Sequence, residues 1–160
     1  MERKLVVIWH SRTGGAKAMA EAILQGSGDG ARMVRAEDAT TEILLRADGY
    51  VFVGPENLGA LTGPMKDMFD RTYYPLLGRV EGRAYATAIA AGSDGTGAQR
   101  QIDRIVTGWR LKRVAEPLIV NFAAQTPEEI FAAKVLPSSH AEACRALGEA
   151  LVAGLEMGIF

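Results

Sequence analysis

Short, continuously apolar segments alternate with segments of helical periodicity along the whole of this chain. The first apolar segment, residues 5–9 (LVVIW), is rich in β-branched side chains, as is typical of strands buried on both faces of a sheet. Four further strands are predicted at residues 31–35, 50–53, 85–90 and 118–120. Strands separated by helices favour right-handed crossovers, so this alternation predicts a parallel sheet covered by helices on both faces.

Apolar residues at helical spacing fill the intervals between these strands. Helices are predicted from Gly15 to the glycine-rich stop GSGDG, at residues 41–46, around Met65 and Phe69, around Ile102 and Trp109, and from Ser139 onward. Residues 121–139 are irregular, apart from a capping box at TPEE, residues 126–129. No repeat or linker divides the chain. We therefore expect a single α/β domain over residues 1–160, a three-layer sandwich built on a five-stranded parallel sheet.

Composition narrows the functional classes. Because 18 Lys and Arg residues face 19 Asp and Glu residues, there is no broad basic field to hold nucleic acid. The single cysteine, Cys144, cannot form an internal disulfide, which favours a reducing compartment, and the residues form no metal-binding cluster. No apolar run approaches the roughly 20 residues of a membrane helix, and the apolar run near the start is too short for a signal peptide. We expect a cytoplasmic protein that binds neither nucleic acid nor membranes.

Polar, glycine-containing loops follow the first, third and fourth predicted strands. In an open parallel sheet, ligands bind beyond the carboxyl ends of the strands. The first loop opens a helix, where free N–H groups and the helix dipole favour an anion, hydroxyls add donors, and glycines admit a phosphate closely. Its candidate cofactor-binding residues are Ser11, Arg12, Thr13, Gly14, Gly15 and Ala16. The alternative for this loop is an empty, well-capped turn.

The loop after the third predicted strand is too long for a bare connection to a helix, and we place the N-cap of that helix at Thr62. Its backbone could face a flat heterocycle, while Leu58 and Leu61 could cover a ring face. The candidates in the second loop are Pro55, Glu56, Asn57, Leu58 and Gly59, and those in the third are Ala91, Gly92, Ser93, Asp94, Gly95, Thr96 and Gly97. Packing on a neighbouring helix, or an ordinary glycine-rich turn, is the alternative for each. Together, three such loops at one sheet edge match a ligand with a phosphate and a ring.

Other readings of the same architecture lack their chemistry. A phosphatase would need a cysteine nucleophile in the first loop, a phosphoacceptor domain an acidic cluster there, and a nucleotide hydrolase the sequence G-x-x-x-x-G-K-[ST]. His10 could contact a substrate, although a local hydrogen bond is the more ordinary role. Tyr73 and Tyr74 could wall a flat pocket or could pack in the core.

The loop sequences resemble a known family. HSRTGGAKAMAEAI is similar to the flavodoxin-type FMN phosphate loop, [ST]-x-T-G-x-[ST], through Ser11, Thr13 and Gly14. It departs from that pattern at Ala16, where the family usually has a hydroxyl. The segments GPENLGALTGPMKDMFDRT and AAGSDGTGAQRQI resemble the flavodoxin-like NAD(P)H:quinone oxidoreductases, including the tryptophan-repressor-binding-protein type. The resemblance extends over most of the chain.

This resemblance implies a flavodoxin-like strand order of 2-1-3-4-5. It also implies FMN, with its phosphate at the first loop and its ring between residues 55–59 and 91–97, NAD(P)H as co-substrate, a quinone or similar small acceptor, and a homodimer or homotetramer. No catalytic side chain is needed, because the flavin carries the redox chemistry. A flavodoxin-type electron carrier is the alternative, but the net charge of −1 and the absence of aromatic residues from PENLGA and AGSDGTG favour the enzyme. A flavin-free interaction protein is the third class left open.

Overall fold

The computed structural model describes residues 4–160. Residues 1–3, which precede the short apolar run near the start, lie outside the described residues. The strands are β1 (Leu5–Trp9), β2 (Ala31–Arg35), β3 (Gly49–Asn57), β4 (Ala60–Leu61), β5 (Ala84–Ala91), β6 (Lys112–Arg113) and β7 (Leu118–Asn121). The helices are α1 (Gly15–Ser27), α2 (Thr41–Arg46), α3 (Gly63–Leu76), α4 (Thr96–Gly108), α5 (Pro127–Phe131) and α6 (Ser138–Glu156). None of the helices within residues 4–160 is both long and apolar enough to cross a membrane.

A parallel sheet in the order β2-β1-β3-β5 forms the centre of the molecule, and both β6 and β7 pair with β5 at its outer edge. β1 lies between β2 and β3, with Leu5 opposite Ala31 on one side and Gly49 on the other. Since β5 and β7 are the fourth and fifth predicted strands, the predicted order 2-1-3-4-5 is confirmed. The strand order reverses between β1 and β3, which is where open α/β sheets bind their ligands.

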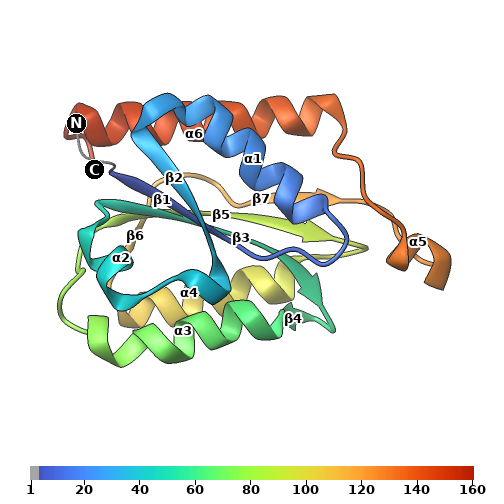
Figure 1. Cartoon of the computed structure of the whole chain (residues 1–160), viewed down its shortest axis with the longest axis horizontal. Coiled ribbons are helices and arrows are strands. Elements are labelled where there is room, and N and C mark those ends of the chain that lie inside the picture. The colour runs from blue at the N-terminus through green and yellow to red at the C-terminus, as the bar shows by residue number, and fades with distance from the viewer. Residues whose placement is uncertain (1–3) are drawn as a thin grey trace.

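Helices cover both faces of this sheet, as Figure 1 shows, with α1 and α6 on one side and α2, α3 and α4 on the other. The side chains of β1 alternate between the two layers: Val6 and Ile8 join the core beneath α3 and α4, whereas Leu5 and Val7 join the core beneath α1 and α6. The three-layer α/β sandwich predicted from the apolar runs is therefore confirmed.

The α1–α6 pair packs closely because glycines lie at the contact. A Cβ atom on Gly148 of α6 would overlap the Ile23 carbonyl oxygen, and one on Gly26 of α1 would overlap the Arg145 carbonyl. Without side chains at these two positions, the helix backbones approach each other directly. This packing fixes α1, whose first turn forms part of the site described below.

The structure differs from the predicted elements at three places. β3 continues past the predicted end to Asn57 and pairs with β4 as an antiparallel hairpin, so the second predicted loop is largely strand. The fifth strand position is shared by β6 and β7, and the segment that separates them ends in Pro117, which has no N–H to continue the ladder. The irregular residues 121–139 contain the short helix α5, whose predicted capping box between Thr126 and Glu129 is confirmed.

Candidate cofactor site

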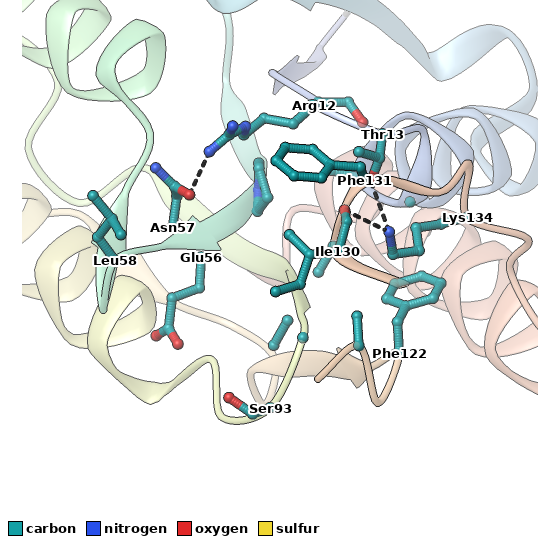
Figure 2. Close-up of a pocket in the computed structure, with 18 of the residues that line it drawn as sticks. Arg12, Thr13, Glu56, Asn57, Leu58, Ser93, Phe122, Ile130, Phe131 and Lys134 are labelled. Atoms are coloured by element: carbon teal, nitrogen blue, oxygen red, sulfur yellow. Dashed lines mark hydrogen bonds between the residues drawn. The ribbon is translucent and has the colours of Figure 1, made fainter. Parts of the chain in front are cut away.

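A cavity of about 430 Å³ lies at the carboxyl ends of β1, β3 and β5, and Figure 2 shows the side chains around it. The predicted residues that line it are Ser11, Arg12, Thr13, Gly15, Ala16, Pro55, Glu56, Asn57, Leu58, Gly59, Ala91, Gly92 and Ser93. The structure thus brings the three predicted loops together at one edge. A cavity of this size is typical of small-molecule and cofactor sites.

The loop between β1 and α1 has the geometry of an anion site. Gly14 precedes the helix with a φ of 100°, a left-handed conformation that favours glycine, and it provides no side-chain cap. The first N–H groups of α1, like those of any helix, have no partner within the helix, and no side chain caps them here. The helix dipole adds positive potential at the same place. Ser11 Oγ accepts a hydrogen bond from the Gly14 N–H at 3.1 Å, which holds the hydroxyl at the loop.

Gly15 lies in close contact with a neighbouring side chain, and its backbone angle does not favour glycine. A Cβ atom at this position would come within 3.0 Å of the Phe122 ring, which packs over the loop. Ala16, the next residue, is buried and offers no hydroxyl. The phosphate loop is therefore closed on one side by an aromatic ring, and it has one fewer side-chain donor than the flavodoxin pattern.

The second side of the cavity is the β3–β4 hairpin. Its turn residues Leu58 and Gly59 both have positive φ angles, 55° and 73°, as two-residue hairpin turns of type I′ require. Leu58 is 96% exposed at the tip of the turn and lines the cavity. Leu61 is buried in the core beneath α3, so the expectation that it would cover a ring face is wrong.

Glu56 binds a helix rather than facing the cavity with its carboxylate. Its two oxygens accept hydrogen bonds from the N–H groups of Gly95 at 2.9 Å and Ala98 at 3.0 Å, at the start of α4. A carboxylate at a helix N-terminus is favoured by the unpaired N–H groups and the dipole. Figure 2 shows the carboxylate directed toward this helix. Glu56 thereby ties the hairpin to the third loop.

Five predicted residues lie outside the cavity lining: Gly14, Asp94, Gly95, Thr96 and Gly97. The last four belong to the connection between the hairpin and the third loop. The backbone of Gly95 holds Glu56, and Thr96 Oγ1 donates to Asp94 Oδ2 at 2.8 Å. A Cβ atom on Gly97 would overlap the Gly59 carbonyl oxygen. Gly97 therefore permits close packing between α4 and the hairpin.

The segment after β7 completes the cavity, and it was not predicted as part of the site. Its contributions are Phe122, Ala124, Ile130, Phe131 and Lys134, to which β5 adds Ala90. The Ala124 N–H donates to the Gly92 carbonyl at 3.0 Å, and the Lys134 N–H donates to the Thr13 carbonyl at 2.9 Å. The segment is thus attached to both the third and the first loop. The capping box at residues 126–129 was the one visible sign that an ordered element follows β7.

Arg12 and Asn57 bridge the cavity from opposite sides. The Arg12 guanidinium donates to Asn57 Oδ1, which joins the first loop to the end of β3 (Figure 2). Both side chains line the cavity, and that of Arg12 is exposed. Arg12 therefore places a positive charge at the cavity.

The histidine candidate and the two tyrosine candidates lie outside the cavity lining. His10 Nδ1 hydrogen-bonds Thr62 Oγ1 at 2.8 Å, and burial lowers the pKa of its imidazole. This local role is the ordinary one weighed above. Thr62 is the predicted N-cap residue of α3, but its side chain makes no capping hydrogen bond. Tyr73 stacks on Trp109, with ring centroids 5.8 Å apart, and neither Tyr73 nor Tyr74 lines the cavity.

The shape and chemistry of the cavity fit FMN. The first loop offers N–H groups and hydroxyls to a phosphate, and the far end is bounded by backbone and by apolar side chains that suit a flat ring. Ser11 and Thr13 would hold the phosphate together with the first turn of α1. The β3–β4 hairpin and residues 91–93 would hold the ring.

Comparisons with known proteins agree with this reading. A curated relative, a flavodoxin of Aquifex aeolicus (strain VF5), is 29% identical over 157 residues, covering 92% of this chain and 84% of its own. A WrbA-like flavodoxin from Agrobacterium tumefaciens has a TM-score of 0.77 at 16% identity, covering 98% of this chain and 99% of the other. A flavodoxin from the domain Archaea has a TM-score of 0.76 at 18% identity, covering 96% and 99%. These structures share the flavodoxin-like fold.

The family comparison covers both the phosphate loop and the hairpin. The family described as NADPH-dependent FMN reductase matches residues 11–125, more than half of the chain. The match begins at Ser11, where the phosphate loop starts, and ends beyond the loop that follows β5. The chain therefore belongs to the NADPH-dependent FMN reductase family of flavodoxin-like, FMN-binding flavoproteins.

Proposed function

We propose that this protein is an FMN-dependent oxidoreductase that passes electrons from NAD(P)H to a quinone or a similar small acceptor. The observation that carries the proposal is one cavity that joins an anion-binding helix start to apolar walls at the switch point of the sheet. Bound FMN would supply both the acceptance of hydride and the release of electrons. The residues of the chain then need to bind, orient and shield the cofactor.

Three further observations support a small-molecule co-substrate. Leu58 stands exposed beside the cavity, so this side of the hairpin is accessible to a flat molecule. The exposed Arg12 brings a positive charge that attracts an anionic nicotinamide nucleotide. The family description names NADPH, which supports a nicotinamide donor for this chain.

An electron carrier is the second candidate, and two observations favour it. One curated relative is named flavodoxin. The cavity also contains the aromatic residues Phe122 and Phe131, which the second and third loops lack. Aromatic residues therefore do border the cavity, although the second and third loops contain none. The choice between enzyme and carrier depends on the reaction with nicotinamide.

Anaerobic spectroscopy of the FMN-loaded protein separates these functions. For the oxidoreductase we expect NADPH or NADH to bleach the flavin absorbance and a quinone to restore it, faster than with free FMN at the same concentration. A carrier retains the bound flavin spectrum with nicotinamide but exchanges electrons with a reduced protein partner. Slow bleaching equal to that of free FMN would contradict the proposal.

The partners remain predictions. We propose a small-molecule acceptor, no nucleic acid or membrane partner, and a homodimer or homotetramer in which a neighbouring subunit borders the cavity. Light scattering of the protein with and without FMN measures its mass in solution. A monomer under both conditions would contradict the assembly.

A further inference from the structure

We infer that Lys134 is a phosphate-binding residue of the cofactor site, and that its charge compensates for the hydroxyl missing at Ala16 while its contacts fasten the segment that carries Ile130 and Phe131. The inference rests on the proposed binding of FMN in the cavity. It assigns to this chain a cationic phosphate contact that comes from the segment after β7, far in sequence from the phosphate loop.

Lys134 contacts the phosphate loop through both its side chain and its backbone. Its ammonium lies 3.2 Å from Thr13 Oγ1, and its backbone N–H donates to the Thr13 carbonyl at 2.9 Å. The Lys134 carbonyl also lies near Gly14, since a Cβ atom built on Gly14 would be 3.8 Å from the carbonyl oxygen. Figure 2 shows the side chain directed toward Thr13. One side-chain contact and one backbone contact thus position Lys134 at the loop that opens α1.

The charge of Lys134 is not balanced by a carboxylate. Its ammonium donates to the carbonyls of Glu129 at 2.8 Å, Ile130 at 3.1 Å and Ala132 at 2.7 Å, and no ion pair among residues 4–160 includes it. The side chain is half-buried and lines the cavity. A partly desolvated cation that has only neutral partners gains most from an anionic ligand.

The neighbouring loop has a matching deficit. Ala16 provides no side-chain donor, so a phosphate would find Ser11, Thr13 and backbone N–H groups there. Ammonium–phosphate contacts are stronger than contacts between neutral groups. Because an ammonium has three N–H donors and four oxygens already lie within reach of this one, a bound phosphate would take a donor in exchange for one of these partners, and the charge of Lys134 would compensate the phosphate.

The same side chain connects the phosphate to the wall of the cavity. Its carbonyl partners Glu129 and Ile130 belong to α5, which begins at a capping box and carries Ile130 and Phe131. These two apolar side chains are 48% and 73% exposed, although they line the cavity. A phosphate held by Lys134 would thus stabilise the position of α5 beside the ring of the cofactor.

Titration with FMN and with riboflavin, which lacks the phosphate, isolates this contact. We expect Lys134→Met to weaken FMN binding by about 10- to 100-fold, the loss typical of a hydrogen bond to a charged group. Riboflavin affinity should stay unchanged, and Lys134→Arg should retain most of the FMN affinity because it keeps the cation. Flavin fluorescence quenching measures all of these affinities without turnover.

Lys112→Met is the matched control, since it removes the same charge from an exposed residue of β6 that lies outside the cavity lining. It should leave the ratio of FMN to riboflavin affinity unchanged. Equal weakening of both ligands by Lys134→Met would show that Lys134 only holds the segment in place, and an unchanged FMN affinity would remove it from the site.

Three further outcomes are informative. If Lys134→Met fails to fold, the wild-type affinity ratio should still fall with rising salt concentration, and a ratio independent of salt would overturn the inference. If the wild-type protein binds neither flavin, the proposed function fails together with the inference. If it binds FMN but the ratio is insensitive to Lys134, the inference alone fails.

Discussion

Cys144 illustrates how packing controls the chemistry of a single residue. This thiol is fully buried in the core beneath α1 and α6, and burial raises its pKa to about 11. Because the thiolate is the reactive form, we predict that Cys144 resists a disulfide reagent at pH 8 in the native protein and reacts promptly in denaturant. Rapid labelling of the native protein would contradict the packing of α6.

His10 gives a prediction about pH. Burial lowers the pKa of its imidazole in the native state, so between that pKa and the unfolded value of about 6.5 the unfolded chain binds more protons. The free energy of unfolding should therefore fall as the pH drops below about 6.5, and the contribution from His10 should be constant above it.

The variant His10→Gln separates this contribution from those of other groups. Urea unfolding at a series of pH values should give a shallower loss of stability on acidification for the variant than for the wild type. Identical slopes for the two proteins would show that His10 titrates alike in the native and unfolded states.

At the scale of elements, the site is held by contacts between segments rather than by any one loop. Glu56 joins the β3–β4 hairpin to the start of α4, and Gly97 permits the two to touch. Residues 122–134 then connect the third loop to the first through Gly92 and Thr13. The cavity is consequently formed by segments that are hydrogen-bonded to one another.

Replacement of Glu56 by glutamine tests this arrangement. The variant keeps the shape but loses the negative charge at the helix N-terminus, so we expect about 1 kcal/mol less stability. Hydrogen exchange at the hairpin should become faster, while Glu149→Gln, on the exposed side of α6, should change neither quantity. Unchanged exchange in Glu56→Gln would mean that the hairpin keeps its place without the α4 contact.

At the scale of the whole molecule, the strand order and the layers follow from patterns that are local in sequence. A continuous apolar run such as LVVIW is typical of a strand that is buried on both faces of a sheet. A glycine-rich loop before a helix predicts the anion site. The hairpin was not predictable in the same way, because Leu58 adopts a positive φ that leucine rarely takes. Its turn lies against α4, where a Cβ atom on Gly97 would overlap the Gly59 carbonyl oxygen.

The remaining part of the site depends on tertiary position alone. Residues 122–134 have neither strong helical nor strand periodicity, and only their path across the sheet edge brings Phe122 over Gly15 and Lys134 to Thr13. Likewise, the glycines of GSDGTG suggested ligand contact, whereas the Gly95 N–H binds Glu56 and Gly97 permits the packing of α4 on the hairpin. Glycine spacing indicates close approach but does not identify the approaching group.

The central claim is that the cavity at the ends of β1, β3 and β5 binds one FMN with its phosphate on the first loop. The most direct measurement is an equilibrium titration with FMN of the wild type, of Thr13→Glu, which introduces a carboxylate where the phosphate is expected, and of Thr107→Glu, which adds the same charge at the exposed end of α4. We predict one FMN per chain with a dissociation constant near 1 μM or below, about −8 kcal/mol, with binding lost in Thr13→Glu and kept in Thr107→Glu. Absence of FMN binding to the wild type, or equal binding by all three proteins, would contradict the account.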